Sequence, residues 1–256
     1  MTNPSDSPKP MEDHSPGALQ PGSQNLLTVI MPAYNEADII AGAVTEWHEE
    51  VIVKLPGSRL LVIDDASTDG TSNVLNQLAA TLSNVSVVRR PVNGGHGQAL
   101  LHGFHQISSE FTFQTDSDRQ HRPADFWRLW GGRNQFDFVF GVRAERHERP
   151  FRRVVTTVMR VLNGLLWQVW ISDANCPFKL MRTEALTTVL KHIPEDTFIP
   201  MVMISILSRR LGFRVTEVPV QHLPRRGGTP SLHGLTRWTR VGWLCVYQLV
   251  RLRLRQ

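Results

Sequence analysis

Two aspartates in the middle of the chain, Asp116 and Asp118, stand one residue apart directly after the strand-like run 111–115. Two carboxylates at this spacing on a turn can share one hard divalent cation, and the same cation can hold a diphosphate. The spacing alone is equally typical of an Asx turn with solvated acids. Because the pair follows a short apolar run, it favours a metal site, with Mg2+ or Mn2+ as the expected cofactor.

A second acidic pair, Asp64 and Asp65, follows the apolar run 60–63. A carboxylate at this place can accept hydrogen bonds from a nucleobase N–H or from ribose hydroxyls. A helix N-cap is the structural alternative, but Asp69 fills that need better. The pair therefore favours nucleotide binding.

Three further segments carry weaker signals. Glycines at 94–97, around His96, let backbone approach a ligand, and the helix N-terminus that follows favours an anion, although a plain loop explains them equally well. No Gly-Lys-Ser/Thr follows, which excludes a Walker-type loop.

The basic loop with Arg225 and Arg226 can either fold over a diphosphate, with glycines as hinges, or stay solvated. Asp173 is a single carboxylate, for which a cap or turn is the ordinary role.

The polar clusters stand at the ends of strand-like runs, and helix-like segments separate those runs. Strands are expected at 26–31, 60–63, 85–88, 111–115, 136–140, 178–181 and 213–220, and helices at 36–54, 71–82, 98–107, from Pro123 onward, and at 154–170, 198–210 and 235–255. This alternation predicts an α/β fold with a Rossmann-like, mostly parallel sheet flanked by helices. Ligands of such sheets bind beyond the carboxyl ends of the strands, where the clusters are expected to meet.

The chain divides by composition into three parts. Residues 1–24 are rich in Pro, Ser and Gly and predict a disordered tail, residues 25–232 form the α/β domain, and residues 233–256 form a basic amphipathic helix. The Trp-containing final helix suits the surface of an anionic membrane. Packing on the domain or on a second subunit is the alternative, which leaves a homo-oligomer open.

Bulk composition narrows the classes of partner. The formal net charge of the 256 residues is +5, and nearly all of the basic residues are arginines. This bias suits phosphorylated or anionic-lipid partners, and codon usage explains it equally well. The arginines are scattered rather than interleaved with a stacking surface, which excludes nucleic acid as the expected partner. Two cysteines make no disulfide framework, and no apolar stretch has the length of a membrane span or the position of a signal peptide. We therefore expect a cytoplasmic protein.

Four ordered motifs resemble family 2 glycosyltransferases of the GT-A fold. Residues 28–36 (TVIMPAYNE) and 62–71 (VIDDASTDGT) resemble the opening of that family, and 93–100 and 115–123 follow in the expected order. The resemblance covers roughly residues 26–232. Within the family, 116–121, 173–181 and the Arg-Arg-Gly-Gly-Thr-Pro-Ser loop are similar to the branch that transfers sugars to polyprenyl phosphate.

The resemblance implies an inverting, metal-dependent hexosyltransferase that moves a sugar from a UDP- or GDP-hexose to a polyprenyl phosphate. It also implies residue roles, position by position. Pro32, Tyr34, Glu36 and Asp65 would surround the nucleoside, with Asp64 in reserve, and Gly95, His96 and Ser117 would complete the donor site. Asp116 would help hold sugar and metal, Asp118 would ligate the metal beside Gln120, Asp173 would act near the acceptor, and Arg225, Arg226 and Ser231 would close over the phosphates.

Two other functions fit the same motifs. One is a soluble transferase with a small-molecule or glycan hydroxyl as acceptor, in which Asp173 would be the general base. The other is a non-catalytic module that senses nucleotide sugars, against which the intact Asp116 and Asp118 count. A polyprenyl-phosphate acceptor would instead place the protein at the cytoplasmic face of the membrane, in peripheral contact through its last helix.

Overall fold

The structure of the chain, a computed structural model, describes residues 25–144, 164, 167–224 and 235–254. Its elements are, in order, β1 (Leu27–Ala33), α1 (Ile40–Trp47), the π-helix η1 (His48–Ile52), β2 (Ser58–Asp64), α2 (Thr71–Thr81), β3 (Val85–Arg89), α3 (His96–Phe104), β4 (Phe111–Thr115), the 3-10 helix η2 (Pro123–Asp125), α4 (Phe126–Trp130), β5 (Phe138–Arg143), β6 (Phe178–Arg182), α6 (Thr183–Leu190), α7 (Pro200–Arg210), β7 (Val215–Val220) and α8 (Leu235–Leu254).

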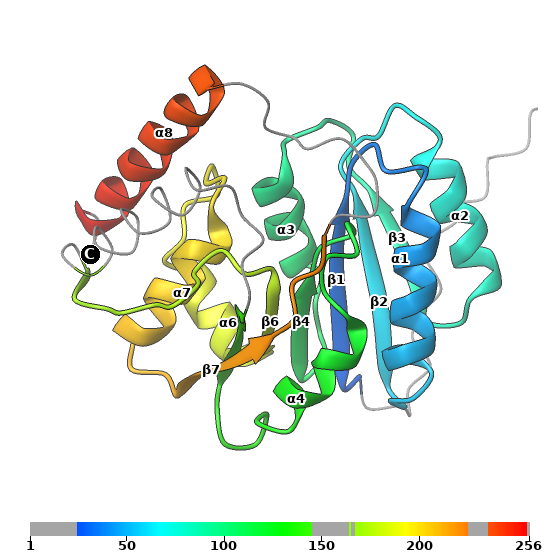
Figure 1. The fold of residues 1–256 in the computed structure, drawn as a ribbon, viewed down its shortest axis with the longest axis horizontal. Coiled ribbons are helices and arrows are strands. Elements are labelled where there is room, and N and C mark those ends of the chain that lie inside the picture. Colours follow the sequence, from blue (N-terminus) through cyan, green and yellow to red (C-terminus); the bar gives the residue numbers. More distant parts are fainter. Residues whose placement is uncertain (1–24, 145–163, 165–166, 225–234, 255–256) are drawn as a thin grey trace, which may run out of the picture.

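The described strands form one seven-stranded sheet in the order β3-β2-β1-β4-β6-β5-β7 (Figure 1). β1 pairs in parallel with β2 and with β4, β2 with β3, and β5 with β7. β6 is antiparallel to both of its neighbours, β4 and β5. The sheet is therefore mostly parallel, as the sequence predicts. The strands β2 and β3 are added on one side of β1 and β4 to β7 on the other, so the strand order reverses between β1 and β4.

Helices cover both faces of the sheet, which explains why the central strands β1 and β4 are buried along their whole length. One core lies under α1, η1, α2 and α4, with residues such as Trp47, Phe113 and Phe126. The other lies under α3, α6, α7 and α8, with residues such as Ile30 and Leu100. Alternate residues of a strand enter opposite cores, so neighbours in the sequence at a strand end have different surroundings.

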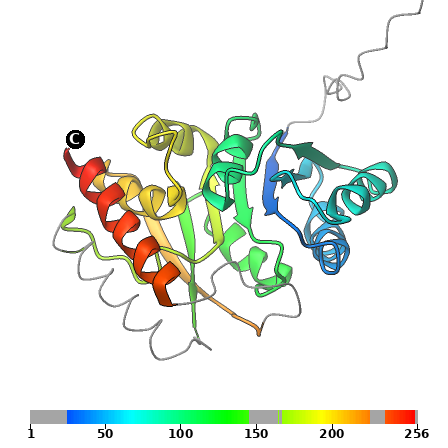
Figure 2. The ribbon, with the colours of Figure 1, turned by 90° about the horizontal axis from the view of Figure 1, so that it is seen from above.

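The last helix, α8, packs on the second half of the domain, and in both overall views it lies at the opposite end of the molecule from α2 (Figures 1 and 2). Leu249 and Leu252 of α8 are buried in the core beneath it. Gln248 Oε1 accepts hydrogen bonds from Thr197 Oγ1 at 2.7 Å and from the Phe198 amide at 3.2 Å. No helix in the described part of the chain is both long and apolar enough to cross a membrane.

Several elements differ from their predicted limits. The helix predicted for 36–54 begins at Ile40, because the segment before it turns through Asn35, whose φ is +51°. From His48 it continues as a π-helix. α6 follows β6 directly and was not predicted. The predicted tail at 1–24 and most of the predicted helix at 154–170, namely 154–163 and 165–166, lie outside the described residues.

Candidate donor-binding site

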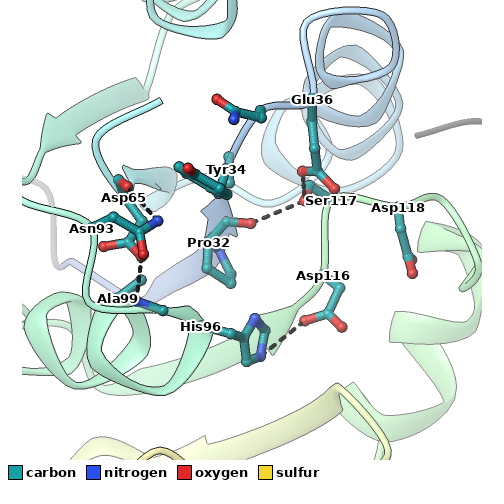
Figure 3. Close-up of a pocket in the computed structure, with 13 residues that line it drawn as sticks. Pro32, Tyr34, Glu36, Asp65, Asn93, His96, Ala99, Asp116, Ser117 and Asp118 are labelled. Carbon is teal, nitrogen blue, oxygen red and sulfur yellow. Dashed lines mark hydrogen bonds and ion pairs between the residues drawn. The ribbon is translucent and has the colours of Figure 1, made fainter. Parts of the chain in front are cut away.

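A pocket of about 560 Å³ opens at the carboxyl ends of β1 and β4, where the strand order changes direction (Figure 3). Ligands of open α/β sheets bind at such a point. The residues around this pocket, called the pocket region below, are Pro32, Ala33, Tyr34, Asn35, Glu36, Asp65, Asn93, Gly95, His96, Ala99, Asp116, Ser117 and Asp118.

The segment after β1 forms one wall of the pocket and is tied to the loop after β2. The Asn35 amide donates to Ser67 Oγ at 3.0 Å, and the Glu36 amide donates to Thr71 Oγ1 at 2.8 Å. These bonds fix the left-handed turn at Asn35. As a result Tyr34, which is 46% exposed, lines the cavity instead of entering a core.

Asp65 holds the glycine-rich loop in place through hydrogen bonds to its backbone. Its carboxylate accepts hydrogen bonds from the Gly94 amide at 3.1 Å and the Gly95 amide at 2.7 Å, and it also pairs with Arg90. Gly95 has φ of +81°, a backbone conformation that favours glycine. Asp65 therefore shapes the wall of the pocket through the loop as well as through its own side chain.

Asp64 is adjacent in sequence but does not line the pocket. It is fully buried and accepts hydrogen bonds from the Ser67 amide at 2.9 Å and from Ser72 Oγ. These bonds anchor the turn that leads into α2. Asp64, the reserve candidate for nucleoside binding, thus lies behind the pocket and holds the turn before α2.

The two aspartates of the central motif leave β4 together. Asp116 and Asp118 both line the cavity, and His96 lies across from Asp116, with its Nε2 atom 3.6 Å from Asp116 Oδ1 (Figure 3). His96 is half-exposed to the cavity, and desolvation by the walls lowers the pKa of its imidazole, against the attraction of nearby carboxylates.

Ser117 connects the two strand ends that frame the pocket. It is buried between Asp116 and Asp118, and its hydroxyl is within bonding distance of the Pro32 carbonyl, at 3.0 Å, and of the Glu36 carboxylate. The backbone then reverses at Arg119, whose φ is +56°. The side chain of Arg119 pairs with Glu46 of α1.

Gln120, predicted beside the metal, does not line the pocket. Its Nε2 donates to the Leu223 carbonyl at 3.1 Å, and the Leu223 amide donates to the Gln120 carbonyl at 2.8 Å. Gln120 thus holds the segment after β7 against the segment after β4. Arg225, Arg226 and Ser231, which continue from there, lie outside the described residues, and their roles stay predictions.

A second charged group, called the ionic region below, lies at the same edge of the sheet beside the ends of β5, β6 and β7. It consists of His121, Arg143, Asp173, Lys179 and His222. Asp173 is 3% exposed, and its two oxygens accept hydrogen bonds from Arg143 at 2.7 and 2.8 Å. The carboxylate predicted to act near the acceptor is thus held in a buried ion pair and does not line the pocket.

Burial dominates the electrostatics of the ionic region. It lowers the pKa of His121 to about 4, with smaller contributions from His222 and Arg143. It also lowers the pKa of Lys179 to about 8. The Lys179 ammonium donates to the Ala174 carbonyl at 3.0 Å and to Ser205 Oγ at 2.7 Å, which fixes the segment that carries Asp173.

The pocket region offers a donor set that fits a hard divalent cation. Among the described residues, no group of three or more His, Cys, Asp or Glu side chains could enclose a metal ion. Mg2+, however, commonly uses one or two carboxylates together with waters and substrate phosphates. Asp116 and Asp118 supply two carboxylates on a cavity of about 560 Å³, so these residues could hold a cation shared with a diphosphate.

Two residues of the site were missed in the sequence. Arg90 pairs with Asp65, and Gln114 Nε2 donates to Asp116 Oδ1 at 3.1 Å. Arg90 offers no signal in this arginine-rich sequence. Gln114 could have been noticed, because a glutamine in a strand predicted to be buried needs a partner.

The comparisons with known proteins agree with this geometry. The sequence model described as Glycosyl transferase family 2 matches residues 28–190. An undecaprenyl-phosphate 4-deoxy-4-formamido-L-arabinose transferase from Edwardsiella ictaluri is 28% identical over 217 residues, which cover 82% of this chain and 64% of that protein. The enzyme of the same name from Salmonella choleraesuis is 26% identical over 79% of this chain and 61% of its own length. The chain thus spans less than two thirds of these curated relatives.

Solved structures share the fold. A mannosyltransferase from Pyrobaculum calidifontis in complex with GDP-Man and Mn2+ has a TM-score of 0.62 and 22% identity, over 96% of this chain and 68% of that one. A glucosyl-3-phosphoglycerate synthase from Mycobacterium tuberculosis in complex with Mn2+, UDP-Glc and phosphoglyceric acid has a TM-score of 0.65 and 21% identity, over 90% and 80%. These similarities confirm the predicted GT-A fold.

Proposed function

The chain belongs to glycosyl transferase family 2, and from this membership we propose that it is an inverting hexosyltransferase that moves a sugar from a UDP- or GDP-hexose to a polyprenyl phosphate. The observation that carries the proposal is the pocket between β1 and β4, with Asp116 and Asp118 on one cavity. The acceptor class is supported by the two relatives named for transfer to undecaprenyl phosphate.

The residues of the pocket region divide the work of donor binding. Tyr34 and Pro32, with Asp65 behind the glycine-rich loop, would surround the nucleoside, and Asp116 and Asp118 would hold Mg2+ or Mn2+ against the diphosphate. When bound, such a cation neutralises the charge that develops on the departing nucleoside diphosphate. His96 would approach the diphosphate from the side opposite Asp116.

The transfer step needs little more than positioning. An oxygen of the acceptor phosphate forms a bond to the anomeric carbon, and the bond from that carbon to the diphosphate breaks with inversion. A phosphate is already ionised at neutral pH, so no general base is needed. The buried pair of Asp173 with Arg143 supports this acceptor class, because a carboxylate held in that way is better suited to fix the local backbone than to accept a proton.

An assay with purified protein tests the function. UDP- and GDP-sugars, Mn2+ or Mg2+, and undecaprenyl phosphate are expected to give a glycolipid that mass spectrometry identifies. Asp118→Ala should lower the turnover by more than about 100-fold, because removing a metal ligand removes several kcal/mol of transition-state stabilisation. Asp137→Asn is the matched control, since Asp137 precedes β5 at the opposite edge of the sheet and pairs with Arg214.

Two outcomes would change the proposal. Donor binding or hydrolysis without glycolipid would retain the donor site and move the acceptor to another class, with hydroxyl acceptors tested next. Full turnover in excess EDTA would remove the cation from the mechanism.

We also propose that α8 brings the protein to the membrane surface. Leu244, Tyr247 and Val250 of α8 are exposed at 43%, 61% and 38%, while Leu249 and Leu252 face the core. An apolar face beside arginines suits an anionic lipid surface. Sedimentation with anionic vesicles should carry the protein down at low salt and less at high salt. Leu244→Ser with Tyr247→Ser should abolish this association, and unchanged sedimentation would refute the role of α8.

A further inference from the structure

Gln114 is a fully buried polar residue on β4, two positions before Asp116. Since alternate residues of a strand share a face, the side chains of Gln114 and Asp116 leave β4 on the same side. The core on that side is built from apolar residues such as Ile30 and Met181. A glutamine here therefore needs an explanation.

The amide of Gln114 holds the carboxylate of Asp116. Gln114 Nε2 donates to Asp116 Oδ1 at 3.1 Å, and His96 Nε2 lies 3.6 Å from the same oxygen. The reversed amide would place its oxygen against the carboxylate, so the donor must face Asp116. The bond restricts rotation of the carboxylate and thereby fixes the direction from which it presents its oxygens to the pocket.

The other end of the same amide lacks a hydrogen-bond donor in the part of the chain that the structure describes. Gln114 Oε1 is buried, and no described residue donates a hydrogen bond to it. Lys179, the register partner of Gln114 on β6, directs its ammonium to Ala174 and Ser205 instead. A buried acceptor without a donor costs stability, and a methionine of similar length would avoid that cost. Folding alone therefore does not account for glutamine at this position.

We propose that Gln114 is a positioning residue, which orients the Asp116 carboxylate for the cation and the donor diphosphate. The inference rests on the proposed function. Outer hydrogen-bond partners of metal-binding side chains typically control metal affinity or activity by about 10- to 100-fold. Gln114 would act in this way without touching the substrate.

Gln114→Met separates positioning from folding. We expect its melting temperature to equal or exceed that of the wild type, since the unpaired buried oxygen is gone. We expect its affinity for UDP or GDP in the presence of Mn2+, measured by calorimetry, to fall by about 10-fold or more. Nucleotide affinity in EDTA should be unchanged, because the walls around the nucleoside are untouched.

Thr112→Val is the matched control. Thr112 is equally buried, lies two residues earlier on the same face of β4, and bonds to Thr183 Oγ1 at 2.8 Å, away from the pocket. It should keep the Mn2+-dependent affinity of the wild type.

Three results would overturn the inference. In the first, Gln114→Met loses melting temperature and affinity together, both with Mn2+ and in EDTA, as a purely structural residue would. In the second, the variant keeps the full Mn2+-dependent affinity beside a normal wild type, which would leave the proposed function intact. In the third, the wild type itself shows no metal-dependent binding, and the proposed function would then fail as well.

Discussion

The pocket region and the ionic region lie at the same edge of one sheet, and both collect charged side chains from strand ends. In the pocket region Asp116 and Asp118 line an open cavity. In the ionic region Asp173, Arg143 and Lys179 are all less than 10% exposed and hydrogen bonded within the chain. A charged residue at a strand end is thus not by itself a ligand-binding residue. Its surroundings decide whether the charged side chain can bind a ligand or instead stabilises the fold.

The first test asks whether the ionic region is structural. Arg143→Met removes both hydrogen bonds that Arg143 gives to the buried Asp173 carboxylate. Breaking a buried pair from one side costs about 3–5 kcal/mol, so the free energy of unfolding in urea should fall by that amount.

Arg214→Met is the control for this loss. Arg214 pairs with Asp137 in the same two-pronged way, but it is exposed, and its replacement should change the stability little. An Arg143→Met protein as stable as the wild type would show that water reaches the pair, and the contrast between the regions would then disappear.

The second test uses pH. Burial lowers the pKa of His121 to about 4, so the folded state favours the neutral imidazole while the unfolded chain takes up a proton near its ordinary pKa. Stability should therefore be complete above pH ~6.5 and fall as the pH drops toward 4, by on the order of 2–3 kcal/mol for this one group.

Urea unfolding of the wild type and of His121→Phe across this pH range measures the contribution of His121. The variant should show a smaller slope, because the other groups that titrate are common to both proteins. Equal slopes would mean that the environment of His121 does not exclude water.

The third and smallest effect concerns two adjacent aspartates. Asp65→Asn weakens the contacts with Arg90 and the glycine-rich loop, and we expect UDP or GDP to bind less tightly by roughly 1–2 kcal/mol. Asp64→Asn should lower the melting temperature but leave nucleotide affinity unchanged, because Asp64 anchors the turn before α2. If calorimetry finds equal losses of affinity, Asp64 belongs to the pocket region after all.

Much of the first half of the fold follows from local sequence. The strands β1 to β4 are short runs between turn residues, and the parallel arrangement puts Tyr34, Asp65 and Asp116 at one edge of the sheet. The sequence therefore predicts both the edge and most of the residues on it. The residue types alone do not decide which of Asp64 and Asp65 faces the cavity, because that depends on which core each strand face meets. The family resemblance implies Asp65, and Asp65 lines the cavity.

The second half depends on contacts that are distant in the sequence. Nothing near Asp173 indicates that Arg143, thirty residues earlier, holds it. The reversed direction of β6 likewise comes from its pairing with β4 and β5 and not from its own residues. The family resemblance implies Gln120 beside the metal, whereas the left-handed turn at Arg119 directs its side chain to Leu223.

The reversed strand β6 has a consequence for how such a protein can diversify. Because β6 runs against its neighbours, β5 ends and β6 begins at the same edge of the sheet, beside the pocket region. A change of chain length between Arg143 and Asp173 would therefore shift no strand and no pairing register, as long as the buried pair of these two residues is kept. Over evolutionary time a lineage could vary the length of the chain at this edge while inheriting the strands and the β1–β4 junction unchanged.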